Sequence, residues 1–144
     1  MDLTSTARTA PRQLLYLASS VHSVRVTAPA RAECVGLLRK RASALFAAWA
    51  MSDDAQAAAE LVISELLTNA VLHGRGMMTL AITRTGPTLD ISVDDHGQSE
   101  RITPPCEPGE HGRGLAIVAA VSCGLQIDET PRGWRARARM NLEP

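Results

Sequence analysis

Three polar residues recur at four-residue spacing near the middle of the chain: Glu65, Asn69 and His73. They lie in an apolar run, residues 53–73, which is followed by Gly74, so we expect them to line one face of a helix. A glutamate carboxylate can accept a proton, and an asparagine amide oxygen is a hard ligand suited to Mg²⁺. Most helical glutamates and asparagines face water, and for this helix taken alone that interpretation stays open.

A second group of polar residues follows a predicted strand. Asp95 comes where the alternation of residues 88–94 ends, and Gly97 follows two residues later. An aspartate at this position can accept a hydrogen bond from an exocyclic amine such as adenine N6, and the glycine permits a sharp turn or the close approach of a ligand. An aspartate-rich turn that merely closes a hairpin is the alternative.

A glycine-rich segment, residues 109–114, precedes an apolar segment with helical spacing, residues 115–121. Backbone N–H groups at the start of a helix favour a phosphate group, and the helix dipole adds to this preference. The segment lacks the Gly-Lys-Ser/Thr of a P-loop, and no βαβ unit surrounds it as in a dinucleotide site. By itself it is also compatible with an ordinary loop.

The elements that must position these residues follow from hydrophobic periodicity. Helical spacing is found in residues 28–50, 53–73 and 115–121, and alternation typical of strands in residues 20–27, 78–84, 88–94, 125–128 and 134–142. Ser52 is a plausible N-cap for the second helix, and Gly86-Pro87 would close a hairpin. The pattern predicts an α+β fold, a two-layer sandwich in which helices pack on one face of a mixed, mainly antiparallel sheet. Residues 96–111 lack periodicity, which is typical of a functional lid.

Length, charge and cysteine usage limit the classes of protein to consider. The 144 residues fit one domain, residues 19–144, after a polar tail, residues 1–18, which could end in a short docked helix. The formal net charge of zero gives no general attraction to nucleic acid or to an anionic membrane. The three cysteines have no Cys-x-x-Cys spacing, the first residues lack the apolar core of a signal peptide, and no apolar run approaches membrane-spanning length. We therefore expect a soluble, cytoplasmic protein.

In order and spacing, the three clusters resemble the motifs of the GHKL ATPase superfamily. The segment Glu-Leu-Leu-Thr-Asn-Ala-Val-Leu-His-Gly, residues 65–74, matches its N-box; Val93-x-Asp95-x-Gly97-x-Ser99 resembles its first glycine box, and Gly112-Arg-Gly-Leu its second. The resemblance covers residues 30–142. Within the superfamily, the form of the N-box and the small size of the chain are similar to the RsbW-type anti-sigma-factor serine/threonine kinases.

The resemblance implies a role for each matching residue. Glu65 would be the general base that activates a substrate serine, and Asn69 would bind the Mg²⁺ that bridges the phosphates of ATP. Asp95 would bind adenine N6, and Gly97 would leave room for the base. The other residues implied in nucleotide binding are His73, Gly112, Arg113, Gly114 and Leu115. For His73 a structural role is the alternative, because a protonated histidine suits the carboxyl end of a helix.

The implied function is that of a Mg-ATP-dependent protein serine/threonine kinase. By resemblance, its partners would be an anti-anti-sigma (STAS-type) protein, which it phosphorylates, and a sigma factor, which it sequesters; a homodimer is expected on the same ground. The chain departs from the family pattern at three places. Ser99 ends the first glycine box, which the RsbW-like subgroup tolerates, and Trp134 stands where relatives often have threonine, which affects the expected fine structure of the base pocket. Glu110 and His111 stand where several relatives carry a basic residue, and this departure weakens the expectation of turnover. A non-catalytic ATP-sensing binding module is therefore the alternative. A histidine-kinase catalytic domain is disfavoured, because it would be expected with a dimerisation helical hairpin that carries a phospho-accepting histidine, and this sequence shows no such pattern.

Overall fold

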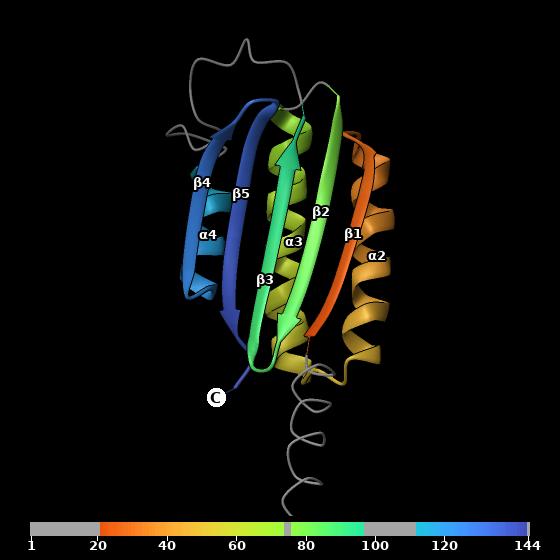
Figure 1. The fold of residues 1–144 in the computed structure, drawn as a ribbon, viewed down its shortest axis with the longest axis vertical. Coiled ribbons are helices and arrows are strands. Elements are labelled where there is room, and N and C mark those ends of the chain that lie inside the picture. The colour runs from red at the N-terminus through yellow and green to blue at the C-terminus, as the bar shows by residue number, and fades with distance from the viewer. Residues whose placement is uncertain (1–20, 74–75, 97–111, 144) are drawn as a thin grey trace, which may run out of the picture.

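The computed structural model describes residues 21–73, 76–96 and 112–143. In this part of the chain, five strands form a sheet and three helices cover one of its faces (Figure 1). The elements in chain order are β1 (Val21–Pro29), α2 (Ala32–Ala48), α3 (Asp53–His73), β2 (Met77–Thr85), β3 (Thr88–Asp95), α4 (Gly112–Val121), β4 (Gly124–Thr130) and β5 (Gly133–Asn141). The predicted α+β class, two-layer arrangement and order of elements are confirmed. The predicted tail, residues 1–18, lies outside the described residues.

The strand order in the sheet is β1-β2-β3-β5-β4, and each neighbouring pair is antiparallel. The described sheet is thus wholly antiparallel rather than mixed. Gly86 and Pro87 join β2 to β3, and Gly86 has a φ of 58°, which a residue with a side chain rarely adopts. After β3 the chain forms α4 and β4, and then β5, which pairs with β3. The central strand of the sheet is therefore β3, and its last residue is Asp95.

The longest helix, α3, has the bounds that the sequence predicted. Ser52 caps it as expected, since its Oγ atom accepts a hydrogen bond from the backbone N–H of Ala55 at 3.2 Å. The helix α4 begins earlier than predicted, at Gly112 instead of residue 115. The glycines of the second glycine box therefore form the first turn of this helix instead of a loop before it.

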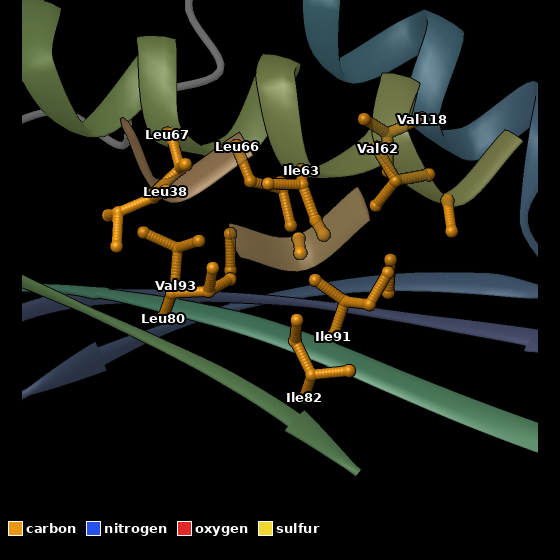
Figure 2. Packing of buried hydrophobic residues seen from close by; sticks show 14 of the residues in the cluster. Leu38, Val62, Ile63, Leu66, Leu67, Leu80, Ile82, Ile91, Val93 and Val118 are labelled. Carbon is orange, nitrogen blue, oxygen red and sulfur yellow. The ribbon is translucent and has the colours of Figure 1, made fainter. Parts of the chain in front are cut away.

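The core lies between α3 and the sheet (Figure 2). The labelled side chains come from α2 (Leu38), α3 (Val62, Ile63, Leu66, Leu67), α4 (Val118), β2 (Leu80, Ile82) and β3 (Ile91, Val93). All of them are at most 4% exposed, and burial of a leucine or isoleucine side chain stabilises a fold by about 1.5–3 kcal/mol. The apolar face of α3 is thereby fixed on the sheet, and the polar residues of the same helix are held in place with it.

By length and composition α3 could also cross a membrane, with a mean hydropathy of 1.2 over an 18-residue window. The expectation that no apolar run approaches membrane-spanning length was therefore wrong. The same composition is found in the core helix of a globular protein. Here the apolar residues of α3 contact the sheet, and the helix is a core helix of this fold.

Candidate functional site

The carboxyl end of α3 and the end of β3 lie at the same end of the molecule (top of Figure 1). Three residues, 74–76, separate His73 from Met77 at the start of β2, and Met78 pairs with Asp95. Helix α4 packs against α3 on the same side of the sheet. The three sequence clusters are thus carried by α3 and by two elements that contact it, β3 and α4.

On α3, Glu65 and Asn69 lie one turn apart, which is about 6 Å along the axis. Asn69 is only 9% exposed, and Glu65 is half-buried. The interpretation that both side chains simply face water is therefore wrong for Asn69. Burial of an amide is costly unless it has a polar partner, so Asn69 is an unusual residue for this position on the helix.

The carboxylate of Glu65 lies directly on the first turn of α4. A Cβ atom placed on Gly114 would be 2.5 Å from Oε2 of Glu65 and 3.5 Å from its Cδ atom. Real side chains do not approach so closely, so this contact depends on glycine. It brings together a residue of the N-box and a residue of the second glycine box, as the sequence predicted.

Two neighbouring aspartates of β3, Asp94 and Asp95, lie on opposite faces of the sheet, because side chains alternate along a strand. Asp95 is 4% exposed and shares the helix-covered face with Val93. Asp94 lies on the open face, where Arg135 binds it through two hydrogen bonds of 2.6 and 2.9 Å. This hydrogen-bonded pairing and the charge of Asp94 raise the pKa of Arg135. Of the two aspartates, only Asp95 faces the helices that carry the other site residues.

Trp134 is the residue directly opposite Asp95 in the adjacent strand β5. It is half-buried and lies on the same face of the sheet as Asp95. The sequence indicated its core-facing side through the alternation of residues 134–142, but not its neighbour, because strand register cannot be read from one strand. An aromatic side chain beside Asp95 is a surface on which a planar base can stack.

A chain of hydrogen bonds holds the residue that follows Asp95. The backbone N–H of His96 donates to the carbonyl oxygen of Met77 at 2.9 Å, which extends the β2–β3 pairing by one residue. The Nε2 atom of His96 lies 2.8 Å from the hydroxyl of Thr79, which in turn lies 2.8 Å from the hydroxyl of Thr27. These contacts across β1, β2 and β3 fix the end of the central strand.

The structure describes some of the remaining predicted site residues and not others. His73 is the last residue of α3 and is half-buried, and Leu115 in α4 is 4% exposed and belongs to the core. Gly112 and Arg113 begin α4, but the side chain of Arg113 lies outside the described residues. Gly97 and the predicted lid, residues 97–111, also lie outside them.

Chemically, the site combines a carboxylate and a buried amide on α3, a buried carboxylate on β3 and the amino end of α4. Such an end favours an anion, and an amide oxygen suits a hard cation. Within the described ranges, no three or more His, Cys, Asp and Glu residues form a group that could hold a metal ion.

Comparison with known proteins agrees with this architecture. The sequence profile of the histidine kinase-like ATPase domain family matches residues 28–140. The fold is similar to that in the crystal structure of the RsbU and RsbW domains of Rv1364c from Mycobacterium tuberculosis, with a TM-score of 0.66 and 22% sequence identity over 84% of this chain. The match spans 32% of the length of that structure. Comparison with curated protein sequences gives no match.

Proposed function

Since the chain belongs to the histidine kinase-like ATPase domain family, we propose that it is an ATP-dependent protein serine/threonine kinase of the RsbW type. The observation that carries the proposal is the contact between Glu65, on the N-box helix, and Gly114, on the first turn of α4. This contact sets a potential base beside a helix end suited to phosphate. A base and a phosphate-binding turn side by side are what transfer of the γ-phosphate to a hydroxyl requires.

Each residue of the site has a proposed task. Asp95 accepts a hydrogen bond from the adenine N6 amine, and Trp134 stacks on the base. The first turn of α4, from Gly112 to Gly114, binds the phosphates through its backbone N–H groups. Glu65 removes the proton from the substrate serine, whose oxygen then attacks the γ-phosphorus while ADP leaves as the other product.

Asn69 is the residue that fits a Mg²⁺ ion. Its amide oxygen is a hard ligand, and its side chain is buried at the level of the site. Mg²⁺ in such sites takes one or two protein ligands and completes its coordination with phosphate oxygens and water. When bound, the ion would neutralise charge on the phosphates of ATP.

The partners are proposed on the likeness to the RsbW domain alone. A sigma factor would be sequestered and an anti-anti-sigma protein of the STAS type would be phosphorylated. A homodimer and a cytoplasmic location belong to the same proposal. Co-purification with a candidate sigma factor, followed by release on addition of the STAS protein, would test the pair of partners together.

Transfer of phosphate from γ-labelled ATP to candidate STAS proteins tests the kinase activity. We expect Glu65→Gln to lower kcat by about 10²–10⁴-fold, the usual contribution of a general base, and to leave the Kd for ATP nearly unchanged. The matched control is Glu60→Gln on the same helix, because Glu60 accepts a hydrogen bond from Ser43 at 2.7 Å and has no part in the site. Equal rates for the wild type and Glu65→Gln would refute the proposed base.

A second candidate function is a module that binds ATP and a partner but transfers no phosphate. The acidic Glu110, found where several relatives carry a basic residue, favours it. Tight ATP binding by the wild type without labelled product on any STAS protein would select this function over the kinase.

A further inference from the structure

Two helical glycines of the described chain differ in what surrounds them. A Cβ atom added to Gly36, in α2, would have no heavy atom within 4 Å, whereas one added to Gly114, in α4, would meet the carboxylate of Glu65 at 2.5 Å. The closest atom is the end of the Glu65 side chain, and the next two belong to the same residue, at 3.5 and 3.9 Å. Among the residues that the structure describes, the three atoms nearest to a side chain at position 114 thus all belong to Glu65.

Backbone conformation does not account for glycine at this position. The described glycines with positive φ are Gly86 and Gly133, and Gly114 is not among them. Alanine could adopt the helical conformation of Gly114 and would be favoured there by its higher helix propensity. What the absence of a side chain at position 114 permits is the observed position of the Glu65 carboxylate.

We propose that Gly114 is a positioning residue, whose missing side chain lets the carboxylate of Glu65 lie on the first turn of α4. This inference rests on the proposed function for its catalytic consequence only. The backbone of Glu65 is held by the core, because the next two residues of α3, Leu66 and Leu67, are at most 1% exposed. A Cβ at position 114 would therefore move the carboxylate by a change of side-chain rotamer, without a shift of the helix.

The position of the base is then coupled to the turn that binds phosphate. The backbone of Glu65 is held in α3, and its carboxylate contacts the surface of α4. A nucleotide that orders or shifts the first turn of α4 would reposition the carboxylate in the same step. In this arrangement Gly114 affects the chemical step through Glu65, in addition to any contact of its N–H group with phosphate.

A double-mutant cycle of unfolding by urea, without nucleotide, tests the contact independently of any activity. The variants are Gly114→Ala, Glu65→Ala and the double variant, with Gly36→Ala as the control for a helical glycine in open space. When Glu65 is present, we expect Gly114→Ala to stabilise the protein less than Gly36→Ala does. When Glu65 is replaced by alanine, we expect Gly114→Ala to stabilise the protein more than it does in the wild-type background. An equal effect of Gly114→Ala in both backgrounds overturns the proposal.

Phosphoryl-transfer kinetics test the consequence for the base. We expect Gly114→Ala to lower kcat by about tenfold or more with a change of less than about threefold in the KM for ATP, since it displaces the base and leaves the nucleotide. Glu65→Asp shortens the side chain by one methylene, so adding Gly114→Ala to the E65D variant should lower kcat no further. If kcat and ATP affinity fall together, and Gly114→Ala costs as much in the E65D background, Gly114 serves the nucleotide only and the positioning role is refuted. If the wild type transfers no phosphate, the kinase proposal fails, and the unfolding cycle still decides whether Gly114 positions Glu65.

Discussion

Two adjacent aspartates show how strand register assigns function at the scale of single residues. Asp95 faces the helices and is 4% exposed, whereas Asp94 faces the other side and is bound by Arg135. Successive side chains of a strand point to opposite faces, so Asp95 lies on the same face as the core residues Ile91 and Val93, and Asp94 lies on the other. Asp95, and not Asp94, therefore lies on the face of the sheet that α3 and α4 cover.

The first prediction concerns recognition of the base by Asp95. We expect Asp95→Asn to weaken ATP binding by about tenfold or more, because a hydrogen bond to a charged acceptor contributes about 1.5–3 kcal/mol. The wild type should prefer ATP to inosine triphosphate, which carries a carbonyl oxygen in place of the N6 amine, and the variant should lose this preference. Calorimetric titration with both nucleotides measures the effect, and Asp90→Asn on the exposed side of the same strand is the control. Unchanged discrimination in Asp95→Asn would remove Asp95 from the base site.

The second prediction uses Trp134 as a reporter of the base. Trp49, the other tryptophan, packs against His22 and Phe46, and its carbonyl oxygen accepts a hydrogen bond from Arg84 at the far end of β2 from the site. In a Trp49→Phe variant, fluorescence therefore reports Trp134 alone, and we expect ATP to change its intensity or emission maximum as the base stacks. In a Trp134→Phe variant the signal of Trp49 should not respond to ATP. A response from Trp49 only would place the nucleotide elsewhere.

At the scale of elements, β3 and β5 are joined by two arginine–aspartate pairs on the open face of the sheet. Asp94 and Arg135 lie beside the site, with side-chain exposures of 12% and 40%, while Asp90 and Arg139 lie farther along and are more exposed. The hydrogen bond and charge of Asp90 raise the pKa of Arg139 as Asp94 does for Arg135. We therefore expect the pair of Asp94 and Arg135 to contribute more to the stability of the fold than the pair of Asp90 and Arg139, because it is more buried.

The third prediction compares these pairs. We expect Asp94→Asn to lower the free energy of unfolding by about 1 kcal/mol, because it breaks a bidentate and partly buried pair. Asp90→Asn should have a smaller effect, since water already screens its pair. Urea unfolding at low and at high salt measures both. An equal loss in the two variants would show that burial of Asp94 contributes nothing to the strength of its pair.

Most elements could be predicted because their residues repeat with a clear period. The run 53–73 gave α3 with its N-cap, and the alternation about Gly86 gave the β2–β3 hairpin. The start of α4 was missed because Gly112 and Gly114 have low helix propensity, so the local sequence gives no sign of a helical turn before residue 115. The proximity of Trp134 to Asp95 was also missed, since it depends on the insertion of β5 beside β3, which no local pattern encodes.

At the scale of the whole molecule, α3 serves the core and the site at once. Its apolar side packs on the sheet (Figures 1 and 2). Its polar residue Glu65 contacts the first turn of α4, and Asn69 follows one turn later on the same helix. A helix fixed in this way needs no rearrangement to present an amide and a carboxylate to a ligand, so little ordering cost would oppose binding. We therefore propose that the nucleotide and the metal ion bind to the folded domain without rearrangement of α3.

The most direct test of this central claim is calorimetric titration of the wild type and of Asn69→Ala with ATP, each with and without Mg²⁺. The account predicts that the wild type binds ATP more tightly when Mg²⁺ is present, and that Asn69→Ala binds ATP with an affinity that no longer depends on the metal. ATP binding that is absent from the wild type, or a metal dependence that is the same in both proteins, would contradict it.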